Sequence, residues 1–252
     1  MIDTVITQPP TPLRILLVGD NCQDVYQFGT VDRISPEAPV PVFVPAHTET
    51  RDGMAGNVFN NLEALGCHVT YLHGETSTKT RLIDARSKQQ IVRIDNDIIS
   101  SPITFDTVIP AVYDAVVISD YNKGTVSYEL IEELIALSIP VFIDTKKTDL
   151  ERFQGAWVKI NELEYSRVTS ECSGLIVTRG ARGALVPHHD IACPALPVEV
   201  ADVTGAGDTF LAALTYQYLH TRDIAEAVSF AIRASAVTVQ HLGCYAPTVE
   251  EI

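Results

Sequence analysis

The chain has 252 residues and a mass of 27.5 kDa, and 46% of its residues are hydrophobic, so it is long enough to bury a substantial core. Thirty-two acidic residues against eighteen basic ones give a formal net charge of -14, which argues against nucleic acid or an anionic membrane as a partner. No run of eighteen uncharged apolar residues occurs, and residues 1–12 lack the basic start and apolar run of a signal peptide. We therefore expect a cytoplasmic protein whose first twelve residues form a loose arm.

Five short runs rich in valine and isoleucine contain few alternating polar residues, which is typical of strands buried on both faces. They cover residues 14–20, 115–121, 140–145, 156–161 and 174–180. Helical patterns occupy residues 55–66, 127–138, the segment after Asp208, and 223–243, with Ser127 placed as an N-cap. This alternation predicts an α/β fold with a mostly parallel central sheet, helices on both faces, and ligands beyond the carboxyl ends of the strands.

Two stretches, residues 26–48 and 78–95, interrupt this rhythm. They are punctuated by proline or alternate in polarity, as edge strands and hairpins do. We predict that they form a small β lid on a single domain that spans residues 1–252.

The segment DVTGAGDTF places two glycines and an acid where a helix is predicted to begin. Gly205, Ala206 and Gly207 would form a tight turn whose free backbone N–H groups, aided by the helix dipole, bind an anion. Asp208 would then lie beside a bound phosphate, where it could accept the proton of an alcohol undergoing phosphorylation. Taken alone, so short a glycine motif favours an ordinary turn with Asp208 as a helix cap, by roughly two to one. The chain has no GxxxxGK[ST] motif, and Phe210 replaces the third glycine of a GxGxxG motif.

The same segment resembles the C-terminal signature of the ribokinase (PfkB) family of carbohydrate kinases. ILLVGDNCQDVYQFGTVDRISPEAPVPVF is similar to the start of one branch of that family, the bacterial D-glycero-β-D-manno-heptose 7-phosphate kinases. TKTR, QQIVRID, VVISDYNKG, VFIDTKKTDLERFQGA and LGCYAPT continue the similarity in the same order, so it covers nearly the whole chain. The resemblance implies a ribokinase-like three-layer α/β/α fold. It also implies that Asp208 is the catalytic base and that the amides of Gly205, Ala206 and Gly207 form an anion hole.

On the acceptor side, the resemblance assigns four residues. Asp20 and Asp24 in GDNCQD match the acids that hold sugar hydroxyls, and Gly53 and Asn57 in DGMAGN match the sugar-binding glycine motif. From the residues alone, Asp20 could simply end a strand and Asp24 could lie in a solvated loop. Met54 stands where the family has a second glycine, so the identity of the sugar stays open.

On the nucleotide side, Asn161 and Glu164 in NELE match the family's NxxE motif, which is associated with magnesium and phosphate, and such oxygen ligands suit Mg²⁺. The other matches beside the nucleotide are Arg179, Gly180 and Gly183 in TRGARG, and Lys146 in IDTKK. Without the resemblance, Glu164 would be a surface helical residue, TRGARG a hairpin turn and Lys146 a solvated loop lysine.

The chain is shorter than these relatives. It lacks the GxD motif and the further helix and strand that usually follow the segment at residues 69–76, and little room for helices follows NELEY. Ile232 stands where relatives often have an asparagine near the adenine, and we expect a kinase domain without the nucleotidyltransferase domain of bifunctional relatives.

Together these patterns predict an enzyme that uses ATP and Mg²⁺ to phosphorylate a hydroxyl of a sugar phosphate, with O1 of a heptose 7-phosphate as the preferred acceptor. The alternatives are a kinase for another sugar or for a nucleoside, and a catalytically idle sugar-phosphate-binding protein. Relatives often pair their lids into dimers, and the run APVPVFV is apolar enough for such pairing. We therefore predict a homodimer that forms through the lid.

Overall fold

One ten-stranded sheet runs through the molecule, of which the computed structural model describes residues 12–104 and 112–252. Residues 1–11 of the predicted N-terminal arm lie outside the described part. The strands are β1 (Arg14–Ile34), β2 (Pro41–Met54), β3 (His68–Asp84), β4 (Gln90–Asn96), β5 (Ala115–Asp120), β6 (Val141–Thr145), β7 (Trp157–Asn161), β8 (Leu175–Thr178), β9 (Ala184–Val186) and β10 (Ile191–Cys193).

The strands β3, β1, β5, β6, β7 and β8 lie side by side in that order and run parallel to one another. The antiparallel pairs are β3 with β4, β1 with β2, β8 with β9, and β9 with β10. The predicted mostly parallel sheet is therefore confirmed.

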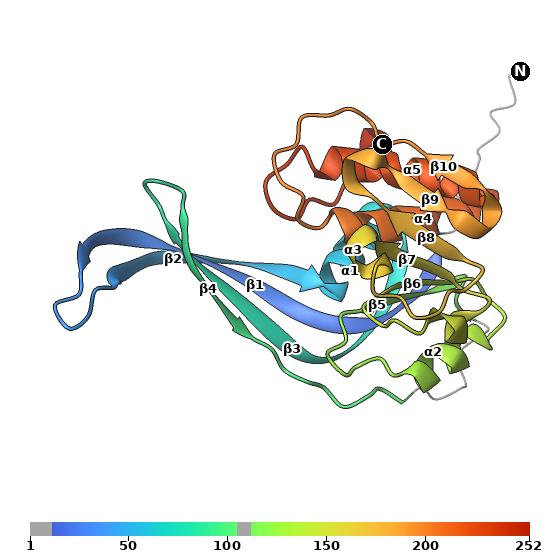
Figure 1. Ribbon diagram of the computed structural model, residues 1–252, viewed down its shortest axis with the longest axis horizontal. Coiled ribbons are helices and arrows are strands. Elements are labelled where there is room, and N and C mark those ends of the chain that lie inside the picture. The colour runs from blue at the N-terminus through green and yellow to red at the C-terminus, as the bar shows by residue number, and fades with distance from the viewer. Residues whose placement is uncertain (1–11, 105–111) are drawn as a thin grey trace, which may run out of the picture.

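Helices cover both faces of the sheet (Figure 1). The α-helices are α1 (Ala55–Ala64), α2 (Tyr128–Ile135), α3 (Glu162–Tyr165), α4 (Ala206–Thr221) and α5 (Ile224–Thr238), and short 3-10 helices occur at Leu150–Phe153, Gly180–Arg182, Pro187–His189 and Val249–Glu251. Among the described residues, no helix has the length and apolar character needed to cross a membrane.

Successive side chains of β1 enter two separate cores, because neighbouring residues of a strand point to opposite faces. Ile15 and Leu17 pack with α1, α4 and α5, whereas Leu16 and Val18 pack with α2 and the 3-10 helix Leu150–Phe153. The predicted three-layer α/β/α fold is confirmed by this arrangement.

Local signals in the sequence place most elements of the core. β5, β6, β7 and β8 fall within the predicted strands, and the hydroxyl of Ser127 caps α2 by accepting from the N–H of Leu130 at 3.1 Å. The last helix is shorter than predicted and ends at Thr238. The carbonyl of Val239 instead accepts from the N–H groups of Ala201 and Asp202, at 2.8 and 3.2 Å.

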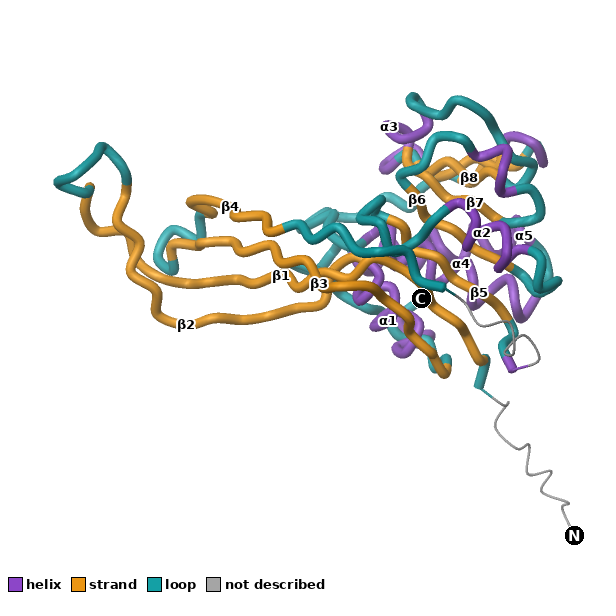
Figure 2. Tube along the Cα trace, turned by 90° about the horizontal axis from the view of Figure 1, so that it is seen from below, coloured by secondary structure: helices purple, strands orange, loops and turns teal. Residues whose placement is uncertain are grey.

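The largest departure from expectation is β1, which does not end at residue 20 but continues to Ile34. It pairs with β5 over residues 15–19, then with β2 from Asn21 onward, and with β3 along most of its length. β3 likewise leaves the core without interruption and pairs with β4. We call residues 21–54 and 76–96 the β extension, a four-stranded sheet that projects from the core (Figures 1 and 2).

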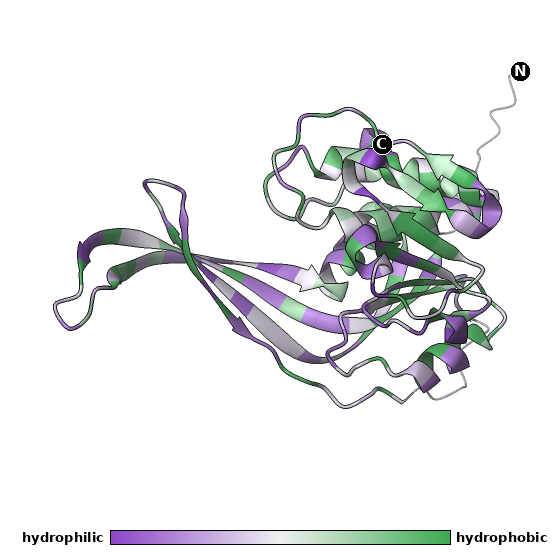
Figure 3. Cartoon of the chain, in the orientation of Figure 1, coloured by the Kyte–Doolittle hydropathy of each residue, from purple (hydrophilic) through white to green (hydrophobic). Residues whose placement is uncertain are grey.

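The β extension contains both stretches predicted as a lid in full, and each of its two segments begins earlier and ends later in the chain than predicted. Its hydropathy alternates, whereas apolar residues concentrate in the strands and helices of the core (Figure 3). No proline interrupts the chain between Asp20 and Ile34, and the paired backbone simply continues past the edge of the core.

Candidate active site

The glycine turn forms the N-terminus of α4. Gly205 is the N-cap and adopts the left-handed conformation with φ +79°, where a Cβ would lie 2.7 Å from Asn57 Nδ2. No side chain caps the helix, so Asp208 is not its cap. Ala206 N–H donates to Val203 O at 3.3 Å, but the N–H groups of Gly205, Gly207 and Asp208 have no partner among the described residues. Unsatisfied amides at the start of a sixteen-residue helix are suited to bind an anion.

Asp208 lies in the first turn of α4 and is only 6% exposed. Its Oδ2 accepts a hydrogen bond from Asn57 Nδ2 at 2.8 Å, and its Oδ1 accepts one from the hydroxyl of Tyr121 at 3.0 Å. Burial raises the pKa of Asp208 to about 6, with a further rise from the charge of Asp144, against the lowering effects of the two hydrogen bonds and of Lys159. A carboxylate with such a pKa suits a general base at neutral pH.

Tyr121 was not predicted as a site residue. It follows β5 directly and lies beneath the ammonium of Lys146, which is 5.0 Å from the ring centroid. The sequence did carry a signal, because Tyr121 follows the carboxyl end of a buried parallel strand, where ligands of α/β sheets bind.

A buried ion pair lies directly below the glycine turn. Lys159 Nζ is 2.5 Å from Asp144 Oδ2 and 3.3 Å from Gly207 O, and both charged residues are almost fully buried. A Cβ on Gly207 would lie 2.9 Å from this ammonium group. Lys159 therefore holds the Gly207 carbonyl inward and adds positive charge beneath the turn. A lone lysine inside the buried strand AWVKIN was the sequence signal for this residue, which was also missed.

Asp20 accepts hydrogen bonds from three backbone N–H groups of the loop after β5. Its Oδ2 accepts from the N–H groups of Tyr121 and Lys123, at 2.8 and 3.0 Å, and its Oδ1 accepts from Thr125 N at 3.3 Å. The residue is 1% exposed. Asp20 thus fixes the loop after β5 that positions Tyr121, and its direct contact with a sugar stays a prediction.

Asp24, Gly53 and Asn57 lie where the β extension meets the core. Asp24 forms an ion pair with Arg81, and a Cβ on Gly53 would come within 2.5 Å of Asp24 Oδ2. The thiol of Cys244 is close to both Asp208 and Asp24, since burial and then these two charges raise its pKa to about 12. The structure therefore brings three of the four predicted sugar-binding residues near Asp208.

Asn161 and Glu164 form a capping box at the start of α3. Asn161 Oδ1 accepts from Glu164 N at 2.9 Å, Glu164 Oε2 accepts from Asn161 N at 2.8 Å, and the remaining oxygen of Glu164 pairs with Lys146. In the described ranges, no group of three His, Cys, Asp or Glu side chains is arranged to hold a metal. The two side chains offer oxygen atoms that fit a magnesium ion retaining water and phosphate ligands, but they do not form a cage of protein ligands.

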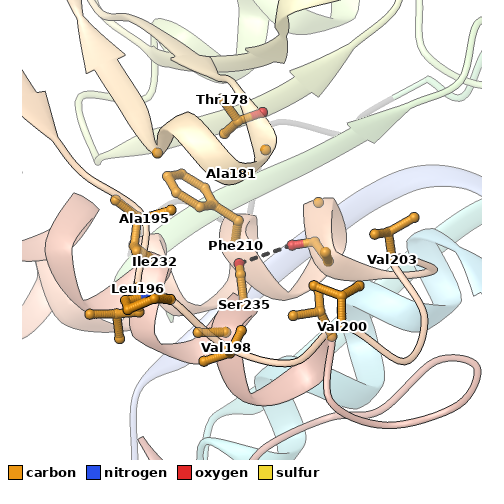
Figure 4. A pocket seen from close by; sticks show the side chains of 17 residues that line it. Thr178, Ala181, Ala195, Leu196, Val198, Val200, Val203, Phe210, Ile232 and Ser235 are labelled. Carbon is orange, nitrogen blue, oxygen red and sulfur yellow. Dashed lines mark hydrogen bonds between the residues drawn. The ribbon is translucent and has the colours of Figure 1, made fainter.

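An apolar cavity of about 510 Å³ opens beside the turn (Figure 4). Ala206, Gly207 and Phe210 of α4 line one part of it, and the lining is completed by Thr178, Gly180, Ala181, Gly183, Ala195, Leu196, Pro197, Val198, Val200, Val203, Ile232, Ser235, Ala236 and Val239. Gly180 and Gly183, predicted beside a nucleotide, thus meet the anion turn at one cavity. Arg179 is not part of the lining, and its guanidinium donates to Arg182 O at 3.1 Å.

The fold has three layers around one sheet. Its site combines an open helix N-terminus, a buried base and an adjacent apolar cavity, and together these features define an α/β phosphotransferase. Residues 154–251 match the family described as pfkB family carbohydrate kinase. The D-beta-D-heptose 7-phosphate kinase of Bordetella bronchiseptica is 32% identical, over 95% of this chain and 95% of that protein. The chain belongs to the PfkB family of carbohydrate kinases.

The bifunctional protein HldE of Nitratiruptor is 36% identical over 95% of this chain, which spans 64% of that protein's length. Among solved structures, the ribokinase of Thermotoga maritima gives a TM-score of 0.71 at 17% identity and covers 95% of this chain and 97% of its own. Arabidopsis thaliana ribokinase, solved with ribose and ATP, gives 0.72 at 16% identity, with coverage of 96% and 97%. The predicted ribokinase-like fold and family are both confirmed by these similarities.

Proposed function

We propose that this kinase transfers the γ-phosphoryl group of ATP to O1 of a heptose 7-phosphate. The observation that carries the proposal is the pairing of a buried Asp208 with the unsatisfied N–H groups of Gly205, Gly207 and Asp208 itself. The name of the Bordetella relative supports the choice of acceptor.

The proposed chemistry is an in-line transfer. The acceptor hydroxyl displaces the Asn57 or Tyr121 hydrogen bond at Asp208 and gives its proton to that carboxylate as the new O–P bond forms. The bond between the γ-phosphorus and the bridging oxygen breaks, and ADP leaves. The amides of the turn and Lys159 stabilise negative charge on the transferred group.

The donor nucleotide would bind along the cavity, with its base among the apolar residues of α4 and α5 and its phosphates toward Ala206 and Gly207. Asn161 and Glu164 would hold the Mg²⁺ ion through water, and this ion would offset the charge of the β- and γ-phosphates. Lys146, Arg179, Gly180 and Gly183 complete the proposed nucleotide side.

On the acceptor side, Asp24, Gly53 and Asn57 would hold the sugar, with Asp20 acting through the loop that it fixes. The β extension would serve as the lid that excludes water, a competing acceptor. Its exposed apolar residues, among them Val40, Val44 and Ile34, would pair two copies into a homodimer in the cytoplasm.

The test is ADP release from ATP and Mg²⁺ with heptose 7-phosphate, hexose phosphates and nucleosides as acceptors. We expect heptose 7-phosphate to give the highest kcat/KM, and phosphorus NMR to place the new phosphate on O1. Asp208→Asn should lower kcat by about 10² to 10⁴-fold. Asp190→Asn, at an exposed left-handed position, is the matched control. Binding of sugar phosphate without acceptor-dependent ADP release would instead identify an idle binding protein.

A further inference from the structure

Four of the seven basic residues of the β extension lie on one face of its sheet. In-register partners on neighbouring strands point to the same side of a sheet, so the pairing defines rows across it. One row contains Arg51, Asp24, Lys79 and Asp95 from β2, β1, β3 and β4. The next row contains Glu49, Tyr26, Arg81 and Arg93. Four cations therefore lie on this face within two adjacent rows.

At the twelve paired positions behind these rows, on the opposite face, no lysine or arginine occurs. These positions are Gln23, Val25 and Gln27 of β1, Asp52, Thr50 and Thr48 of β2, Thr78, Thr80 and Leu82 of β3, and Asn96, Ile94 and Val92 of β4. The four cations share their face with the acids Asp24, Glu49 and Asp95, which leaves an excess of one positive charge there. In a protein with a net charge of -14, even this local excess favours an anionic ligand on that face.

The basic face is the one that approaches Asp208. The guanidinium of Arg51 lies against Gly243, so that a Cβ on that glycine would overlap it. The next residue, Cys244, has its sulfur 3.3 Å from the position that a Cβ on Gly205 would occupy. Arg51 is thus separated from the anion turn by two residues of a single loop. Arg51 shares its row with Asp24 and Lys79, and this row lies beside the proposed acceptor site.

The four cations are not equally available. Arg81 is paired with Asp24, and Arg93 is paired with Asp95 at 2.8 Å. Lys79 is half-buried and has no carboxylate within 4 Å in the described part of the chain. Arg51 has only a long contact of 3.4 Å with Glu49, and its side chain is 41% exposed.

The ring of Tyr26 positions the guanidinium group of Arg51. Its ring lies between two guanidinium groups, with Arg51 at 5.1 Å and Arg81 at 5.2 Å from the centroid. Lys79, on the other side of β1, lies close enough to Cys22 that its charge opposes the rise in the pKa of that thiol caused by burial. Arg51 and Lys79 therefore flank Asp24 from the two neighbouring strands.

We propose that Arg51 and Lys79 form the binding site for the phosphate group that the acceptor sugar already carries. This inference rests on the proposed function, since it assumes that the hydroxyls of the same sugar meet Asp24 and Asp208. Asp24 lies between the two cations in the row, but its carboxylate is neutralised by Arg81, so a phosphate dianion can form charge-assisted hydrogen bonds with both Arg51 and Lys79. The site selects phosphorylated sugars over free sugars.

The test compares Lys79→Met and Arg51→Met with Lys88→Met, which removes an exposed charge at the turn between β3 and β4. We expect each of the first two variants to raise KM for heptose 7-phosphate by ~10-fold or more, the effect of losing a charged hydrogen bond. KM for ATP and KM for free heptose should stay as in the wild type, and Lys88→Met should change none of them. Equal losses for the phosphorylated and the free sugar, or no loss, would overturn the assignment.

A calorimetric titration separates this inference from the proposed function. If the wild type releases no ADP with any acceptor, the kinase proposal fails, but binding of mannose 6-phosphate and mannose can still be compared. A wild-type preference for the phosphorylated sugar that disappears in Lys79→Met supports the phosphate site. Absence of that preference, or its survival in the variant, refutes the site.

Discussion

Charged side chains are buried at the core edge around Asp208 but largely exposed in much of the β extension. At the core edge, Lys159, Asp144 and Asp20 are nearly inaccessible, and hydrogen bonds hold each of them in one orientation. In the extension, Arg51 and Arg93 keep 41% and 49% of their side chains exposed, and their partners Glu49 and Asp95 are 47% and 33% exposed. If the sugar binds as proposed, the reaction depends on one rigid and one adaptable set of charges.

This contrast teaches where stability and recognition reside. A buried ion is costly to leave unpaired, so Lys159 and Asp144 must stay together for the turn above them to keep its shape. Exposed pairs contribute little to stability, because water competes for both partners. Arg51 and Arg93 can therefore exchange their exposed partners for a ligand without a large effect on folding, whereas Arg81 is held in a largely buried pair with Asp24.

The largest effect should follow from breaking the core pair. Lys159→Met leaves the Asp144 carboxylate buried without its partner, so we expect the free energy of unfolding to fall by about 3–5 kcal/mol. Arg93→Met breaks an exposed pair of the extension and should cost at most about 1 kcal/mol. Urea denaturation followed by circular dichroism measures both.

A double variant checks the cause of that difference. Replacing both partners, Asp144→Leu with Lys159→Met, should restore most of the lost stability, because no unpaired charge remains. It should not restore kcat, since the positive charge below Gly207 is gone. Recovery of both properties would show that Lys159 only fills space.

The next effect concerns the hydrogen bond from Tyr121 to Asp208. The pKa of Asp208 in the free enzyme is about 6, and only its carboxylate form accepts a proton, so kcat/KM for the acceptor should fall as the pH drops through about 6. Tyr121→Phe removes a donor that favours the charged form, so the pKa should rise and the acidic limb of the kcat/KM profile should shift up by roughly half a unit. The measurement is kcat/KM for the acceptor between pH 5 and 9.

Tyr128→Phe is the control for this shift. Tyr128 stacks on Phe153 at 5.5 Å in the core on the other face of the sheet. Loss of the Tyr128 hydroxyl should leave the acidic limb of the pH profile at the same pH as in the wild type. If Tyr121→Phe lowered kcat/KM equally at every pH, Tyr121 would act by packing and not through the charge of Asp208.

The contrast also explains how much could be predicted from the sequence. The core strands could be predicted because burial on both faces leaves unbroken apolar runs. The turn could be predicted because GAGD places glycines where a helix begins. Tyr121 and Lys159 were missed because their roles arise from contacts with residues 87 and 48 positions away. No local pattern marks such partners.

The extension was predicted in its composition but not in its boundaries. β1 crosses from core to extension at GDNCQD, where nothing in the sequence signals an end, and only the change of partner from β5 to β2 marks the transition. The basic face was invisible for a similar reason. Arg51, Lys79 and Arg81 become neighbours only once the register of three strands is known.

A smaller effect is expected at the cap of α2, in the layer farthest from Asp208. Ser127→Ala removes the acceptor for Leu130 N–H and should lower the free energy of unfolding by about 1 kcal/mol. Both kcat and KM should match the wild type, because α2 packs on the opposite face of the sheet from α4. A change in kcat would mean that the two layers are more tightly coupled than the contrast implies.

The smallest effect should occur at the junction of the two regions. Met54 ends β2 directly before α1 and adopts φ +53°, ψ -131°, a conformation that costs a residue with a side chain about 1–3 kcal/mol. Its side chain is 6% exposed, and its burial contributes a similar amount. Met54→Gly removes both effects at once, so we expect the free energy of unfolding to stay within about 1 kcal/mol of the wild type.

Met54→Ala separates the two contributions, because it loses the buried side chain but keeps a Cβ at positive φ. It should be less stable than the wild type by about 1–3 kcal/mol. The gap between the glycine and alanine variants, measured by urea denaturation, then gives the strain stored where the extension joins the core. Equal stability of the two variants would mean that the junction bears no strain and that the β extension meets the core in a relaxed conformation.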